Sequence, residues 1–104
     1  MIKYIKSKEE FQNEIKSGTV VVDFFATWCN PCQRLGQVLE KIAGEDNPLR
    51  IIKVDVDQFQ ELAMEYNVES IPQINILKDG KEVYSFLGYK GSDELNEIFT
   101  KYCK

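Results

Sequence analysis

The sequence has no histidine, no long apolar run and no cluster of basic residues. Its most apolar stretch, Val20 to Ala26, is too short to cross a bilayer and contains Asp23. Charges recur every second or third position in residues 1–11, which excludes the apolar segment of a signal peptide and predicts a cytoplasmic protein. The net charge of −4, with no Lys/Arg run among aromatic residues, argues against nucleic acid or a membrane surface as a partner.

Nucleotide-binding motifs are also missing. Neither G-x-G-x-x-G nor G-x-x-x-x-G-K-[ST] occurs, so no nucleotide cofactor is expected to bind the chain. The sequence contains no repeats and no low-complexity segment. Its 104 residues, 43 % apolar and 29 % charged, predict one globular domain over residues 1–104. A domain of that size can bury a core without help from disulfides or metal.

Apolar periodicity predicts strands and helices in the order β-α-β-α-β-α-β-β-α. The strands are expected at residues 2–5, 19–25, 50–56, 73–78 and 82–87, with a polar link at 45–49. The run TVVVDFF at residues 19–25 is apolar apart from one carboxylate, which is typical of a central strand covered on both faces. Asp79-Gly80 predicts a tight hairpin, which makes the last strand pair antiparallel. The fold class is therefore α/β, with helices around a mixed sheet.

Local signals mark where the helices begin and end. Residues 7–10 have the form of a capping box, and Ser92 is expected to cap the final helix. Gly18, Gly44 and Asn67 are expected to end the first three helices. These signals divide the chain into short elements joined by tight connections.

Two cysteines stand where the central strand gives way to a helix, in the segment Trp28-Cys29-Asn30-Pro31-Cys32. Pro31 suits the first turn of that helix, because its missing N–H would be unpaired there anyway. Cys29 then lies at the helix mouth, where free backbone N–H groups and the positive end of the dipole favour thiolate over thiol. Cys32 faces the same side of the helix, close enough for a disulfide. The pattern predicts a reactive pair, with a lowered pKa for Cys29.

Two other roles for the cysteine pair are weaker. A structural disulfide that closes so small a loop removes little entropy from the unfolded chain, and disulfides are rare in the cytosol. A zinc site needs four ligands, whereas this chain has no histidine and its third cysteine, Cys103, stands alone near the other end. Cys103 is expected to be an incidental free thiol. A reactive dithiol without metal is the favoured interpretation.

The segment FFATWCNPC closely resembles the active-site segment of the thioredoxin family, whose usual form is W-C-G-P-C. The likeness extends over nearly all of residues 1–104, in the order and lengths of the elements. It implies the thioredoxin fold, a central mixed five-stranded sheet flanked by four helices. It also implies a thiol–disulfide oxidoreductase that reduces protein disulfides, with Cys29 as the nucleophile and Cys32 as the resolving cysteine.

Two charged residues outside the motif also match the family. Asp23 falls where the family keeps a buried acid, and an ionised carboxylate is costly in a central strand, which favours a functional role over a structural salt bridge. Burial should raise its pKa and make it a proton acceptor near neutral pH. Lys53 lies where the family has a lysine, and its tuning role beside Asp23 follows from the resemblance alone.

The resemblance also implies a surface on which the partner protein docks. Residues 70–72 match the loop that holds the family's cis-proline, and Gly88 matches the glycine after the last strand. The family's extended partner segment pairs with the backbone of the residue before that proline. The surface, called the docking patch below, surrounds the exposed sulfur of Cys29 and comprises Trp28, Pro31, Ile71, Pro72 and Gly88.

The implied partners are a thioredoxin reductase, to which the flavin and NADPH belong, and disulfide-containing proteins such as reductases and peroxidases. No cofactor is expected on the chain itself, and a monomer is expected. Two alternatives stay open. One is a specialised donor that serves one dedicated partner, and the other is a non-catalytic binding module on the same fold. The intact cysteine pair and Asp23 argue against the binding module.

Four residues depart from the family's usual pattern. Gln33 replaces a lysine, Gln73 a threonine and Tyr89 a smaller residue. Tyr89 enlarges one rim of the docking patch and is expected to alter the choice of partner. Asn30 replaces a glycine; as an N-cap its side chain would accept a helix N–H and so shift the pKa of Cys29. These departures affect tuning and specificity and leave the reaction class unchanged.

Overall fold

The computed structural model describes residues 1–44 and 48–103. Its elements follow the predicted order and are β1 (Ile2–Tyr4), α1 (Lys8–Ile15), β2 (Thr19–Phe25), α2 (Asn30–Ala43), β3 (Ile51–Asp55), α3 (Gln60–Glu65), β4 (Gln73–Lys78), β5 (Lys81–Leu87) and α4 (Ser92–Tyr102). The polar link predicted at 45–49 falls partly on residues 45–47, which lie outside the described residues.

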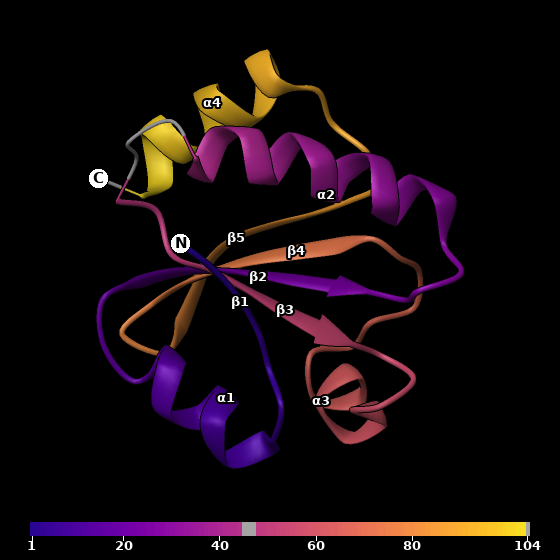
Figure 1. The fold of residues 1–104 in the computed structure, drawn as a ribbon. Helices are drawn as coiled ribbons and strands as arrows, with labels where there is room; N and C mark the ends of the chain where they lie inside the picture. The colour runs from indigo at the N-terminus through magenta and orange to yellow at the C-terminus, as the bar shows by residue number, and fades with distance from the viewer. Residues whose placement is uncertain (45–47, 104) are drawn as a thin grey trace.

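The five strands form one mixed sheet in the order β1-β3-β2-β4-β5. Strands β1, β3 and β2 run parallel, whereas β4 is antiparallel to both β2 and β5. Helices α2 and α4 cover one face of the sheet, and α1 and α3 cover the other (Figure 1). The prediction of a mixed sheet, with residues 19–25 as its central strand, is confirmed.

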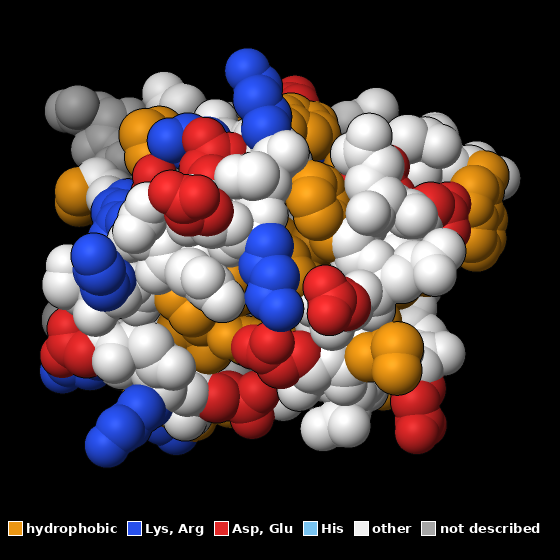
Figure 2. All heavy atoms as spheres, turned by 90° about the horizontal axis from the view of Figure 1, so that it is seen from below, with side chains coloured by type: hydrophobic (Ala, Val, Ile, Leu, Met, Phe, Trp, Pro, Cys, Tyr) orange, Lys and Arg blue, Asp and Glu red, His pale blue; other side chains and the backbone are white. Residues whose placement is uncertain are grey.

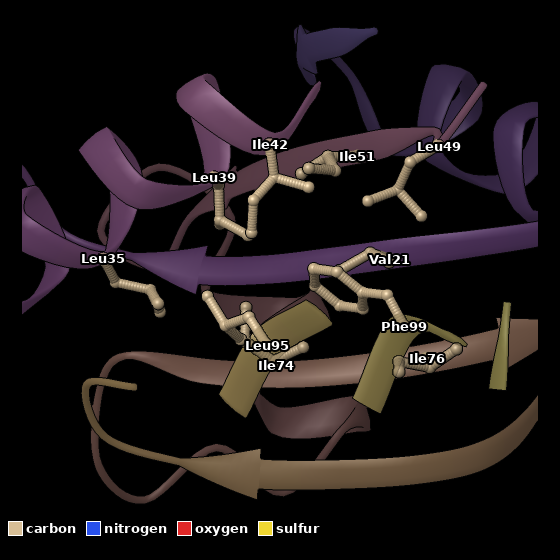
Figure 3. Close-up of a cluster of buried hydrophobic side chains, with 10 residues drawn as sticks. All are labelled: Val21, Leu35, Leu39, Ile42, Leu49, Ile51, Ile74, Ile76, Leu95 and Phe99. Atoms are coloured by element: carbon tan, nitrogen blue, oxygen red, sulfur yellow. The ribbon is translucent and has the colours of Figure 1, made fainter. Parts of the chain in front are cut away.

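Both faces of β2 contribute to the apolar core, because successive side chains of a strand point to opposite sides. The cluster between the sheet and helices α2 and α4 is drawn in Figure 3 and contains Val21, Leu35, Leu39, Ile42, Leu49, Ile51, Ile74, Ile76, Leu95 and Phe99. The cluster on the opposite face includes Val20, Val22 and Phe24. By the same alternation, Asp23 shares the face of Val21 and points toward α2.

Most of the predicted element ends are confirmed. Ser7 caps α1, since its Oγ accepts the backbone N–H of Glu10 at 3.0 Å. Asn67 directly follows the C-cap of α3 with φ of 53°, the left-handed backbone that ends helices, whereas α1 ends earlier than predicted, at Ile15 with Lys16 as its C-cap, and Gly18 (φ 78°) lies two residues further on. Asp79 and Gly80 have φ of 50° and 84° and connect β4 to β5 as a tight hairpin.

The predicted cap of α4 is wrong by one residue. Ser92 is the first helical residue, and the N-cap position belongs to Gly91, which has an extended backbone and no side chain to offer a hydrogen bond. The Gly91 carbonyl accepts the Leu95 N–H at 3.0 Å, which places the first turn of the helix one residue earlier than the serine would. A cap residue must have an extended backbone, and glycine adopts it here at no steric cost.

The surface seen from the side of α1 and α3 mixes charges of both signs. In Figure 2 the Lys and Arg side chains lie among Asp and Glu side chains and do not gather into one basic area. Within residues 1–44 and 48–103, no helix has the length and the apolar content needed to cross a membrane.

Candidate active site

The cysteine pair lies just beyond the carboxyl end of β2, where the chain turns into α2 (Figure 1). Cys29 and Cys32 are joined in a disulfide. Cys29 keeps 5 % of its surface exposed and Cys32 only 2 %, so both are largely covered. The expectation of an exposed Cys29 sulfur was therefore too strong: Ile71 and Val56 pack against the pair and against Ala26 below it.

Cys29 itself caps α2. Its Sγ accepts the backbone N–H of Cys32 at 3.2 Å, and Pro31 occupies the first turn as predicted. The predicted cap role of Asn30 is wrong, because Asn30 is the first helical residue and its side chain is exposed. The cap side chain is the one that faces the free N–H groups of the first turn, and that side chain is the Cys29 thiol.

A buried ion pair lies behind the cysteines. Asp23 on β2 and Lys53 on β3 are register partners, with Lys53 Nζ 3.4 Å from Asp23 Oδ2. Asp23 is fully buried, and its two oxygens accept no hydrogen bond within the described part of the chain. Burial raises the pKa of Asp23 to about 6, because the loss of hydration outweighs the opposing charge of Lys53. The structure thus places Lys53 beside Asp23, as the resemblance implied.

The ammonium of Lys53 is enclosed by aromatic rings and by a helix. It lies 4.7 Å from the ring centroid of Phe25 and 5.3 Å from that of Tyr4. Gly36 of α2 faces it so closely that a Cβ there would be 3.1 Å from Nζ. A cavity of about 450 Å³ is lined by both Cys32 and Lys53 and opens to solvent. Cys32 and the Lys53 member of the ion pair therefore border one space that can hold water, whereas Asp23 does not line it.

The loop of residues 70–72, called the docking loop below, approaches the cysteine pair from the start of β4. The Ile71–Pro72 peptide bond is cis, as the resemblance implied, and the Ile71 carbonyl oxygen lies 4.0 Å from Cys29 Sγ. Gly88 donates its N–H to the Pro72 carbonyl at 2.8 Å, which ties the end of β5 to this loop. Gly88 has φ of 87°, and no atom lies within 4 Å of a Cβ built there. The loop and Gly88 thus border the cysteines with open space beside them.

Trp28 completes this surface. Its side chain is 69 % exposed, so it does not serve ordinary core packing. Its Nε1 donates to Asp57 Oδ2 at 2.9 Å, which fixes the indole next to Cys29. The structure therefore brings the predicted residues of the docking patch to one edge of the sheet, around the disulfide.

Sequence reasoning missed two features of this edge. Gly36 was not singled out, although an isolated glycine inside a helical pattern is itself a signal of close packing. The contact between Arg34 and Tyr89 was also missed: the Arg34 guanidinium carbon lies 5.3 Å from the Tyr89 ring centroid. Since 55 residues separate the two in sequence, no local pattern connects them.

The third cysteine lies away from this edge, at the end of α4. Cys103 is free and half-buried, and burial raises its pKa to about 11, so it stays a thiol at neutral pH. No group of three or more Cys, Asp or Glu side chains suited to holding a metal ion occurs among the residues that the structure describes.

Comparison with known proteins agrees with the geometry. The sequence profile of the Thioredoxin family matches residues 3–101. The chain is 44 % identical over 98 residues to a thioredoxin of Chlamydia trachomatis, covering 94 % of this chain and 96 % of the relative. It is 41 % identical over 95 residues to a thioredoxin of Bacillus subtilis, covering 90 % and 91 % of the two chains.

Solved structures give the same result for the fold. A thioredoxin from Nicotiana alata superposes with a TM-score of 0.89 at 32 % identity, covering 99 % of this chain and 93 % of the other. The oxidised thioredoxin of Plasmodium falciparum gives a TM-score of 0.88 at 33 % identity, with both chains covered completely. The fold, the cysteine pair and the relatives agree, and the chain belongs to the thioredoxin family of thiol–disulfide oxidoreductases.

Proposed function

We propose that the chain acts as a protein disulfide reductase in which Cys29 is the nucleophile. The position of Cys29 at the N-cap of α2 carries this assignment, since its sulfur already accepts a backbone N–H at 3.2 Å. A thiolate in that place gains from the same N–H and from the positive end of the helix. It is also the more exposed of the two cysteines and the one nearer to the docking loop.

The reaction proceeds in two exchanges of sulfur bonds. Cys29 thiolate attacks one sulfur of the partner's disulfide, a mixed disulfide forms, and the other partner sulfur leaves as a thiolate. Cys32 then loses its proton and attacks Cys29 Sγ, which releases the second partner thiolate. The partner gains two electrons, and the Cys29–Cys32 disulfide is left on the chain.

Asp23 accepts the proton of Cys32. A pKa of about 6 leaves the carboxylate ionised at neutral pH yet basic enough to take a proton. The cavity lined by Cys32 and Lys53 provides room for water beside the thiol and the ammonium that pairs with Asp23. Lys53 tunes the pKa of Asp23, because its positive charge opposes the effect of burial. Asn30, exposed between the cysteines, tunes the pair without capping the helix.

The docking patch binds an extended segment of the partner. The open space at Gly88 and the exposed indole of Trp28 leave room for a chain to lie across Pro31 and Ile71, beside the buried Pro72. The backbone of Ile71 pairs with that chain.

Partners are disulfide-containing proteins such as reductases and peroxidases, and a thioredoxin reductase that carries flavin and NADPH restores the dithiol. The chain works as a monomer and a single domain in the cytoplasm.

A Cys32→Ser variant tests the roles of the two cysteines. Mixed with an oxidised partner it should accumulate a covalent adduct through Cys29, seen by mass spectrometry, because nothing can resolve the mixed disulfide. A Cys29→Ser variant is the matched control and should form no adduct. Absence of an adduct with Cys32→Ser, while the wild type reduces insulin in the presence of reductase and NADPH, would overturn the assignment.

A further inference from the structure

Two side chains, Arg34 and Tyr89, border the docking patch and contact each other. Arg34 lies four residues after Asn30 and three after Pro31 on α2, so it shares the helix face of the residues between the cysteines. Tyr89 directly follows Gly88. The segment from β5 to α4 passes beside the N-terminal half of α2 (Figure 1), and there the Arg34 guanidinium lies over the Tyr89 ring at 5.3 Å.

This contact holds a cation at the surface without neutralising it. Arg34 is exposed and Tyr89 is 46 % exposed. Within residues 1–44 and 48–103, no carboxylate lies within 4 Å of Arg34. The neighbouring cation, Lys90, differs in this respect, because it pairs with Glu94 at 2.8 Å. Arg34 is therefore the cation of this border whose charge remains available to a partner.

The chemistry of this pair favours one kind of ligand. The cation–π contact with the Tyr89 ring engages the charge of Arg34 and does not consume its five N–H donors as hydrogen bonds. A guanidinium matches the two oxygens of a carboxylate and can donate two parallel hydrogen bonds to them. The contact also restricts the long side chain before the partner arrives, so that less rotamer freedom is lost on binding.

We infer that Arg34, oriented by Tyr89, is a specificity-determining residue that selects partner segments with an Asp or Glu close to the cysteine under attack. This inference rests on the proposed reductase function, since the segment must lie across the docking patch. The overall charge of −4 repels acidic partners at long range, so the preference acts at close contact rather than through the field of the whole molecule. Tyr89 thereby acts as a positioning residue for Arg34.

The test uses two synthetic disulfide peptides that differ at one residue beside the reactive cysteine, Glu in one and Gln in the other. The second-order rate of reduction by the reduced protein is measured by stopped flow at low salt. The wild type should reduce the Glu peptide about fivefold faster, the effect of one exposed charge-assisted contact. In Arg34→Gln the ratio of the Glu-peptide rate to the Gln-peptide rate should fall to about 1. In the wild type, 0.5 M salt should lower the same ratio.

Two further variants keep the test specific. Lys90→Gln removes the neighbouring cation that already has a partner, so the wild-type ratio should persist. Tyr89→Ala keeps the charge of Arg34 but frees its side chain, so the ratio should fall between those of the wild type and Arg34→Gln. Equal rates for both peptides in the wild type, or an equal loss in Lys90→Gln and Arg34→Gln, would overturn the inference. Failure to reduce either peptide would instead contradict the proposed function.

Discussion

Asp23 lies in the middle of the central strand with its side chain toward α2, where Lys53 offers an opposite charge 3.4 Å away. Neither carboxylate oxygen accepts a hydrogen bond within the described part of the chain. A carboxyl group in such a place gives up part of its hydration, and its pKa rises to about 6. The residue is therefore close to half-protonated under mildly acidic conditions, which suits a group that takes and returns protons.

We expect Asp23→Asn to slow the resolution of the mixed disulfide far more than its formation. The amide cannot accept the Cys32 proton, and the loss of a general base costs on the order of 100-fold in rate. Rapid-quench mass spectrometry of the adduct separates the two steps. In the wild type the resolution rate should rise with pH through a midpoint near 6, and this inflection should vanish in the variant.

Asp93→Asn serves as the control for that experiment, because it removes one exposed carboxylate from the first turn of α4. Its resolution rate should equal that of the wild type. Equal slowing of formation and resolution in Asp23→Asn would show that Asp23 does not act as the base for Cys32.

At the scale of single elements, the residue that would best stabilise helix α2 differs from the residue that the active site requires. Glycine in a helix interior costs about 1 kcal/mol relative to alanine. Gly36 nevertheless occupies the second turn, where a Cβ would lie 3.1 Å from Lys53 Nζ. The missing side chain is what allows the ammonium to lie between α2 and Asp23.

The Gly36→Ala variant should therefore change the pKa of Asp23 while it leaves the stability of the fold nearly unchanged. The variant gains helix propensity, so its resistance to urea should not fall by more than a few tenths of a kcal/mol. The new methyl group pushes the Lys53 ammonium away from the carboxylate, which should raise the pKa of Asp23 above its value of about 6. NMR titration of the Asp23 carboxyl carbon measures that pKa. Lys41→Ala, exposed on the last turn of α2, is the control and should leave the titration unchanged.

The capping of α1 gives a prediction about stability alone. Ser7 Oγ accepts the Glu10 N–H, and Glu10 Oε1 accepts the Lys6 N–H at 2.8 Å. Ser7→Ala removes the first of these bonds and should lower the free energy of unfolding by about 1 kcal/mol, with disulfide reduction unaffected. Ser17→Ala is the control nearby, since its backbone carbonyl accepts a hydrogen bond from Arg50, while its side chain makes none within residues 1–44 and 48–103. Urea unfolding of both variants checks the difference, and equal stabilities would contradict the cap assignment.

For the whole molecule, the raised pKa of Asp23 makes stability depend on pH. Folding disfavours the ionised form of this carboxyl, so the group costs no stability well below pH 3.8, where it is protonated in both states. As pH rises from about 4 to about 6 the unfolded state ionises first, and the folded state loses stability. The gap between 3.8 and about 6, at 1.36 kcal/mol per unit, corresponds to about 3 kcal/mol.

Urea unfolding of the oxidised wild type and of Asp23→Asn, at several pH values between 4 and 7.5, measures this effect. Other groups titrate alike in the two proteins, so the difference between them isolates Asp23. The variant should gain on the wild type by about 2 kcal/mol between pH 4 and pH 7.5, because part of the full effect is already present at pH 4. A difference that stays constant with pH would show that Asp23 is not ionised at a raised pKa in the folded protein.

Much of the fold could be predicted because it follows from local patterns. The apolar run of β2, the Asp79-Gly80 hairpin and the Ser7 cap each rest on residues that are neighbours in sequence. The start of α4 could not be placed to one residue, because Gly91 and Ser92 both suit an N-cap. The same ambiguity affected Asn30, since the better cap beside it is a cysteine.

The site was predictable only as far as family resemblance reaches. The cysteine pair has its own spacing signal, but the cis bond before Pro72 and the pairing of Lys53 with Asp23 depend on the packing of distant segments. The same holds for the contact of Arg34 with Tyr89. Such contacts form when α2, the docking loop and the end of β5 meet at one edge of the sheet, which no single stretch of sequence specifies.

Trp28 is the chain's single tryptophan, and it lies exposed beside Cys29 with its indole N–H held by Asp57. All indole emission from the protein therefore originates at the docking patch. A partner chain that covers the ring and displaces water will shift that emission to shorter wavelength, and a change in the adjacent sulfurs will change its intensity. The molecule thus carries an intrinsic optical label at the place where binding and electron exchange occur, and both can be followed in the unmodified protein.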